Sequence, residues 1–144
     1  MLMLVVLLTV MACKKPSFSV IPKINFIQMD KQKIQAGSDT GEVNITFFVE
    51  DGDGDIGANS GNFIFKDSRD NSETSFTVPT IPEEYAPEKG IRANIVVAYR
   101  AAWLNLREDT THLHLDTLQW QVFLVDKTGN KSNVVATDTL ILMK

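Results

Sequence analysis

The chain has 144 residues, which is room for one domain of ordinary size. Hydrophobic residues make up 44% of it and charged residues 22%, a composition typical of a globular protein rather than a disordered one. The formal net charge of −4 argues against a nucleic-acid-binding protein, because such a protein needs a basic face to displace counterions from phosphate. A single cysteine excludes an internal disulfide and any zinc site built from several cysteines.

The first twelve residues, MLMLVVLLTVMA, are almost wholly apolar and carry no charge. A helix of this length rises about 18 Å, too short for the roughly 30 Å hydrocarbon core of a bilayer. The length instead suits the apolar part of a signal peptide. We therefore expect a signal peptide over residues 1–12, a lipidated tether over residues 13–19 and one folded domain over residues 20–144.

The segment Val10-Met11-Ala12-Cys13 resembles the lipobox of bacterial lipoproteins. In that family the signal peptide is removed just before the cysteine, whose thiol carries a diacylglyceryl group. The resemblance implies that Cys13 is lipidated and that its acyl chains hold the protein at the bacterial cell envelope, at the outer membrane. Two or three acyl chains, at about 0.8 kcal/mol per buried methylene, anchor a protein stably. The alternative is a buried core thiol, although Cys13 precedes every strand pattern.

Seven runs of alternating apolar and polar residues follow the tether, and this period of two is typical of β-strands. In the second run one face consists of Val43, Ile45, Phe47 and Val49, and in the sixth of Leu118, Trp120, Val122 and Leu124. The seven runs cover residues 20–30, 42–50, 62–66, 73–78, 91–100, 117–125 and 134–143.

The connections complete the prediction of the fold. A polar turn at residues 67–72 joins the third and fourth runs into a hairpin. Residues 79–90 contain three prolines and are expected to form a loop, while residues 101–107 are the best candidate for a short helical turn. We expect an all-β fold, an antiparallel seven-stranded sandwich of the immunoglobulin or fibronectin type III kind.

The motifs together resemble small Bacteroidetes-type lipoproteins with an immunoglobulin-like domain. The shared features are the lipobox, FFVEDGDGDIG, the DSR that follows a strand, TVPTIP and the closing VDKTGNKSN. They cover nearly the whole mature chain, and residues 51–57 and 126–133 are the most specific. The resemblance implies a fold and an envelope location far more than an activity.

Residues 51–57, DGDGDIG, place three carboxylates at a spacing of two with glycines between them. Calcium prefers six to eight oxygen ligands, and adjacent carboxylates repel each other unless a cation neutralises them. The run resembles the start of an EF-hand loop. Ile56 stands where that loop needs glycine, however, and Asn62 stands where it needs a bidentate glutamate, so an EF-hand is excluded.

Strand order suggests a different calcium site. In an immunoglobulin-like order, the connection after the second strand and the connection after the sixth lie at the same end of the sandwich. Asp126 would then approach Asp51, Asp53 and Asp55 as a fourth metal ligand. The N-terminus would lie at that end too, which favours a structural calcium over one that recruits a ligand. The alternative is a solvated turn, since aspartate and glycine favour tight turns.

Two weaker patterns concern aromatic and imidazole side chains. Trp103 and Tyr85 lie in expected loops and are candidates for stacking against a sugar ring. His112 and His114 lie on one face of an extended segment, where they could ligate zinc with Asp109 or Asp116, although an exposed connection is the alternative.

No P-loop, G-x-G-x-x-G run or nucleophile elbow is present, so we expect no enzyme. The sequence predicts a lipid-anchored envelope protein that acts as a non-catalytic binding or spacer module, stabilised by calcium if the acidic loop binds it. Its partner would be another envelope protein or a glycan. The alternative is a glycan-binding accessory lipoprotein of an outer-membrane nutrient-uptake system.

Overall fold

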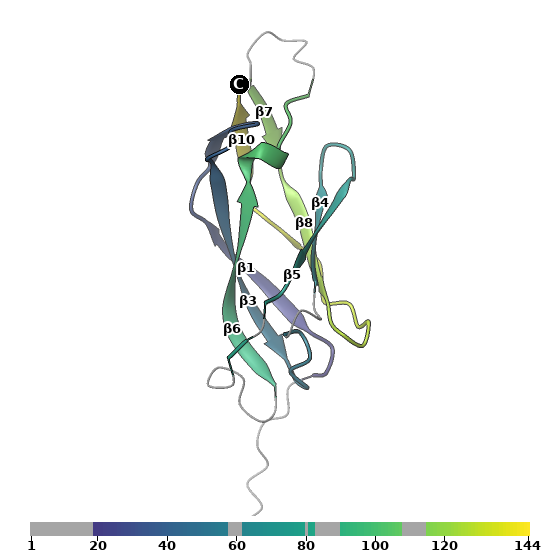
Figure 1. The fold of residues 1–144 in the computed structure, drawn as a ribbon. Helices are drawn as coiled ribbons and strands as arrows, with labels where there is room; N and C mark the ends of the chain where they lie inside the picture. Colours follow the sequence, from purple (N-terminus) through teal and green to yellow (C-terminus); the bar gives the residue numbers. More distant parts are fainter. Residues whose placement is uncertain (1–18, 58–61, 80, 83–89, 108–114) are drawn as a thin grey trace, which may run out of the picture.

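The structure, a computed structural model, describes residues 19–57, 62–79, 81–82, 90–107 and 115–144. These residues form ten strands and one short 3₁₀ turn, so the prediction of an all-β fold is confirmed (Figure 1). Among them no helix is long and apolar enough to cross a membrane. The elements are β1 (Lys23–Met29), β2 (Lys33–Gln35), β3 (Glu42–Asp51), β4 (Asn62–Asp67), β5 (Glu73–Thr77), β6 (Ile91–Arg100), η2 (Ala101–Trp103), β7 (Leu115–Leu118), β8 (Trp120–Val125), β9 (Val135–Ala136) and β10 (Leu140–Met143).

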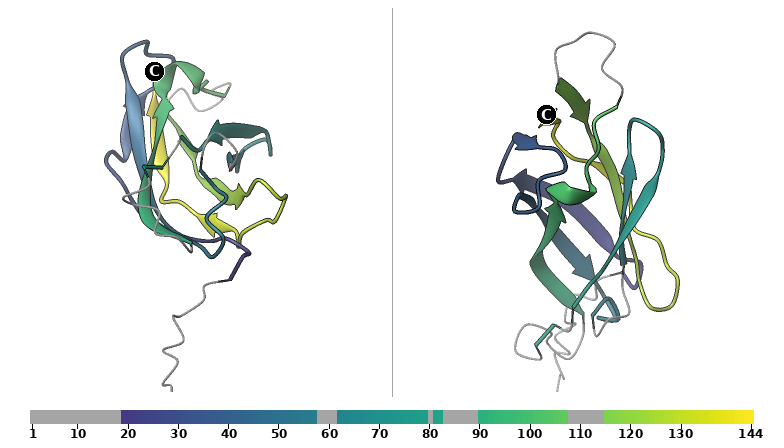
Figure 2. Two further views of the ribbon diagram at one scale, coloured as in Figure 1. Left: turned by 60° about the horizontal axis from the view of Figure 1, so that its bottom comes forward. Right: turned by 45° about the horizontal axis from the view of Figure 1, so that its top comes forward.

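The strands form three sheets rather than the two of the predicted seven-stranded arrangement. Their orders are β1-β3-β6, β5-β4-β8-β9 and β2-β10-β7. The first two sheets face each other across the core, as the views in Figure 2 show. Every named pairing is antiparallel except that of β2 with β10, which is parallel.

The core lies between these two facing sheets, extends to residues of the third sheet and follows the predicted alternation. The β3 side chains that share one face, Val43, Ile45, Phe47 and Val49, are fully buried, and so are the predicted inward residues of β7 and β8. The ring of Phe47 on β3 contacts Phe63 and Phe65 on β4, with centroids 5.1 and 5.8 Å apart. Burying a large apolar side chain stabilises a fold by about 1.5–3 kcal/mol, so this interface holds the two sheets together.

The last two predicted strands are each divided between two sheets. Residues 117–125 contribute to β7 and β8, and residues 134–143 contribute to β9 and β10. At the crossing, the buried Thr137 exchanges hydrogen bonds with Trp120: its Oγ1 accepts from the Trp120 N–H at 3.1 Å, and its own N–H donates to the Trp120 carbonyl at 3.0 Å. The side chain of Gln119 donates to the Thr137 carbonyl at 2.7 Å. Because these bonds satisfy the backbone where regular pairing stops, the chain changes sheets without leaving buried polar groups unpaired.

The β4–β5 turn carries an ion network at the end of the molecule where β7 and β10 also lie (Figure 1). The Arg69 guanidinium donates to Asp67 at 2.7 Å, to Asp116 on β7 at 2.7 Å and to the carbonyl of Asn105 at 2.9 Å. The three charged side chains are largely buried. The hydrogen bonds that Arg69 donates to Asp67 and then to Asp116 raise the pKa of Arg69 above its ordinary value, so the guanidinium stays charged and joins two sheets.

Candidate metal centre

Three aspartates meet at the opposite end of the molecule. Asp51 is the last residue of β3, Asp126 directly follows β8, and Asp55 lies in the β3–β4 connection. One carboxylate oxygen from each lies within 4.8 Å of the other two. Because β3 and β8 belong to different sheets, the cluster brings together the ends of the two facing layers.

Asp51 is the most confined of the three. Its side chain is 0% exposed, and neither carboxylate oxygen has a well-formed hydrogen bond from the described part of the chain. Burial raises the pKa of Asp51 to about 6, and the charges of Asp53, Asp55 and Asp126 add to the rise, which the backbone amide of Asp55 offsets only in part. An ionised carboxylate in this position has lost its hydrating water without gaining a full set of hydrogen-bond partners. This raises the free energy of the folded state unless a cation lies beside the carboxylate.

Asp126 differs because its own turn holds it in place. Its Oδ1 accepts from the Asn130 N–H at 2.7 Å and from the Thr128 hydroxyl at 3.1 Å, while its Oδ2 accepts from the Asn130 side chain at 2.8 Å. Burial alone would raise the pKa of Asp126, but these hydrogen bonds outweigh it and lower the pKa below the usual range. Asp126 is therefore an ionised, pre-positioned carboxylate.

Asp55 completes the cluster between these two. Burial raises the pKa of Asp55, the charges of Asp126 and Asp53 raise it further, and Thr128 lowers it in part. Three carboxylates in one place present up to six oxygens, and oxygen ligands in this number suit a hard cation such as calcium.

Two glycines shape the backbone around the cluster. Gly54 adopts φ +73°, a left-handed conformation that ends the extended run after Asp51. Gly90, at φ +94°, lies under the acidic loop, where a Cβ would come within 2.6 Å of the Asp51 carbonyl oxygen. The segment before β6 therefore supports the loop from a part of the chain that the acidic motif does not include.

The stability of the protein in EDTA is expected to fall as pH rises from about 4 to about 6. The folded protein binds the Asp51 proton more tightly than the unfolded chain, where the pKa is 3.8, so deprotonation favours unfolding. Asp51 alone accounts for about 2–3 kcal/mol over this range, at about 1.4 kcal/mol per pKa unit. Urea unfolding measured at several pH values tests this.

Asp51→Asn provides the control for the pH dependence. The Asp51→Asn protein lacks the titrating group, so its free energy of unfolding should change little between pH 4 and 6 apart from the smaller contribution of Asp55, which has the same sign. Equal pH profiles for the wild type and Asp51→Asn would contradict this assignment.

The remaining predicted ligand, Asp53, lies outside the cluster. Its side chain is exposed, although it is close enough to raise the pKa of Asp51 and of Asp55. Asp116 is held by Arg69, so the structure engages it in an ion pair rather than in the suggested zinc site. The other candidates, Cys13, Tyr85, Asp109, His112 and His114, lie outside the described residues.

Trp103, a predicted sugar-stacking residue, belongs to an aromatic cluster. Its ring is half exposed, contacts Phe76 and Tyr99 at centroid distances of 5.9 Å each, and has the Arg100 guanidinium over it at 5.6 Å. Part of the ring therefore remains accessible.

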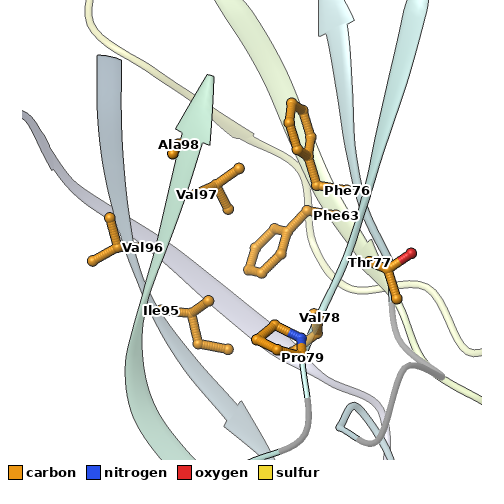
Figure 3. Close-up of a pocket in the computed structure, with 9 residues that line it drawn as sticks. All are labelled: Phe63, Phe76, Thr77, Val78, Pro79, Ile95, Val96, Val97 and Ala98. Carbon is orange, nitrogen blue, oxygen red and sulfur yellow. The ribbon is translucent and has the colours of Figure 1, made fainter. Parts of the chain in front are cut away.

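A small apolar cavity of about 140 Å³ opens between β5 and β6, the edge strands of the two facing sheets. Figure 3 shows Ile95 and Val97 of β6 and Phe63 of β4 around it. None of its described lining residues carries a carboxylate, an imidazole or a thiol.

Thr128, Asn130 and Gly90 are the residues of the centre that reasoning from the sequence missed. The threonine, glycine and asparagine that follow Asp126 indicate a turn, but nothing in the local sequence shows that this turn positions the Asp126 carboxylate. Comparison of the chain with models of protein families, with curated proteins and with solved structures finds no match, so the geometry of the site carries the functional argument.

Proposed function

We propose that this protein is a lipid-anchored module of the bacterial outer membrane, attached through Cys13, whose folded domain binds calcium at Asp51, Asp55 and Asp126. The observation that supports calcium binding is the buried Asp51 carboxylate, which lacks a well-formed hydrogen bond and faces two further carboxylates. The cation would neutralise the three charges and connect the ends of β3 and β8.

The ligand chemistry favours calcium over other common metals. All three side chains are carboxylates, whereas zinc and copper sites draw on imidazole or thiolate ligands. Magnesium needs near-ideal octahedral geometry at short distances, while calcium tolerates irregular sets of oxygens. Oxygens spread over up to 4.8 Å in a loop and two strand ends form such an irregular set.

The proposed role is non-catalytic presentation of a binding surface or spacing from the membrane. The two facing sheets, one of which contains the β4–β5 hairpin, are compatible with an immunoglobulin-like or fibronectin type III-like sandwich, to which we assign the domain. In such a module the acyl chains fix the protein to the membrane, while loops or a sheet edge meet an envelope partner.

Calcium is expected to raise the melting temperature of the full chain, purified in mild nonionic detergent at pH 7.5. A ligand that binds only the folded state stabilises it by about 2.7 kcal/mol at a hundredfold excess over its Kd. For a domain of this size that corresponds to a rise of about 10 °C. Thermal unfolding followed by circular dichroism in millimolar calcium and in EDTA measures the difference.

Two single substitutions within one loop provide matched controls. Asp51→Asn should abolish the calcium response, because Asp51 supplies the most deeply buried of the three carboxylates. Asp53→Asn removes the same charge from an exposed position and should retain most of the response. Identical wild-type melting curves in calcium and EDTA would refute the proposal.

The glycan-binding alternative rests on the accessible part of the Trp103 ring. That tryptophan is already in contact with Arg100 and with the rings of Phe76 and Tyr99. Such contacts are found for an aromatic residue packed on a protein surface as well as for one that stacks against a sugar. The acidic cluster is the better supported site, because the ionised Asp51 carboxylate carries an electrostatic cost that a bound cation would relieve.

A further inference from the structure

The N-terminal segment of the domain is attached to both loops that supply the carboxylates. The Ser19 carbonyl accepts a hydrogen bond from the Gly52 N–H at 2.8 Å, next to Asp51. On its other side, Ile24 exchanges two hydrogen bonds with the side chain of Asn133: its N–H donates to Oδ1 at 3.0 Å, and its carbonyl accepts from Nδ2 at 2.8 Å. Residues 19–24 therefore lie between the β3–β4 loop and the chain that follows the β8–β9 turn.

Asn133 is tied closely to the turn that positions Asp126. The preceding residue, Ser132, donates from its N–H to the Leu124 carbonyl at 2.9 Å, and its Oγ accepts from the Leu124 N–H at 2.8 Å. Lys131 also pairs with Val125, the residue before Asp126. A shift of the β8–β9 turn would therefore move Asn133 with it.

Residues 19–24 are thus hydrogen-bonded on one side to the loop that begins at Asp51 and on the other to the chain that follows the turn of Asp126. Without a cation, the carboxylates of Asp51, Asp55 and Asp126 repel one another across a buried space where water screens them poorly. Repulsion moves the two loops apart, which strains the bonds that Ile24 and Ser19 make to opposite sides. A divalent cation removes the repulsion and holds the two loops at one spacing.

We propose that the cation bound at Asp51, Asp55 and Asp126 fixes the N-terminal segment 19–24 to the domain, so that the attachment of the membrane tether depends on the cation. This inference rests on the proposed function. The rest of β1, from Asn25 to Met29, stays paired with β3 with or without the cation. Calcium would then set how rigidly the domain stands on its tether, rather than whether the domain folds.

Hydrogen exchange of the full chain in mild nonionic detergent tests the inference, with calcium alone as the ligand. The Ile24 amide donates to Asn133, so its exchange rate reports the attachment of the segment. We expect it to exchange about tenfold more slowly in millimolar calcium than in EDTA. The Asp67 amide, which donates to the Ser72 carbonyl at the other end of the molecule, should exchange equally in both.

Asn133→Ala separates the attachment from cation binding. It removes both hydrogen bonds to Ile24 and none of the carboxylates, so Ile24 should exchange fast in calcium and in EDTA, while calorimetry still detects calcium binding. Asn94→Ala, on the exposed face of β6, is the matched control and should behave as the wild type. Calcium binding without a change in Ile24 exchange would overturn this inference alone, whereas no calcium binding by the wild type would overturn the proposed function as well.

Discussion

Replacing Arg69 with methionine is expected to lower the free energy of unfolding by about 2–4 kcal/mol and the melting temperature by about 10 °C. Methionine retains much of the length of the side chain but removes the charge. It leaves the largely buried carboxylates of Asp67 and Asp116 without their cation and the Asn105 carbonyl without its donor. Removing one partner of a buried ion network costs more than the network contributes, because the remaining charges stay desolvated. Urea unfolding at pH 7 measures the loss.

Arg92→Met is the matched control for this substitution. The Arg92 guanidinium also contacts a carboxylate, Glu50, at 3.0 Å, but the Arg92 side chain is 59% exposed. Exposed ion pairs contribute about 0–1 kcal/mol, so this protein should unfold close to the wild type. Asp67→Asn with Asp116→Asn should restore part of the stability lost in Arg69→Met, because the unpaired charges are then gone. Equal effects of Arg69→Met and Arg92→Met would show that the network does not join the sheets.

Gly90→Ala is expected to cost about 2–5 kcal/mol and to weaken the proposed calcium binding several-fold. A Cβ at this position would lie 2.6 Å from the Asp51 carbonyl oxygen and 3.1 Å from that of Gly52, so the acidic loop has to shift. The positive φ of +94° adds about 1–2 kcal/mol for a residue with a side chain, and the forced contact adds about 1–3 kcal/mol. Because the displaced atoms belong to Asp51 itself, stability and calcium affinity should fall together.

Gly129→Ala separates the two parts of this cost. Gly129 has nearly the same φ, +91°, and lies in the β8–β9 turn of the same centre, but a Cβ there meets nothing within 4 Å. Only the conformational cost of about 1–2 kcal/mol applies. Urea unfolding in EDTA and calcium titration calorimetry on both proteins give the comparison. Equal losses for the two would show that Gly90 does not support the acidic loop.

The alternation of apolar and polar side chains predicted the strands, because successive side chains of a strand point to opposite faces of the sheet. The predicted range 91–100 coincides with β6, and the buried face of β3 is the predicted one. The division of residues 117–125 between β7 and β8 could not be predicted, because the alternation of apolar residues continues through Gln119 without a break. What divides the strand is a hydrogen-bonded contact with Thr137, 17 residues away from Trp120, and a local pattern carries no information about it.

The candidate site shows the same limit. The expected strand order predicted that Asp126 would lie near the acidic loop, and the structure places it beside Asp51 and Asp55. A spacing of two would put all three loop aspartates on one side of an extended strand, but β3 ends at Asp51 and the left-handed Gly54 turns the chain, which leaves Asp53 exposed. The support from Gly90 follows from the packing of distant segments and has no signature in the motif.

The parallel pair of β2 and β10 has a consequence for when the protein folds. β10 lies between β2 and β7 and contributes the fully buried Leu140 and Leu142. Leu142 pairs with Ile34, about 100 residues earlier, and pairings over such a distance make folding slow. Until β10 has been synthesised, Ile34 and Leu118 lack the strand that lies between β2 and β7. The third sheet therefore cannot form before β10 has left the ribosome.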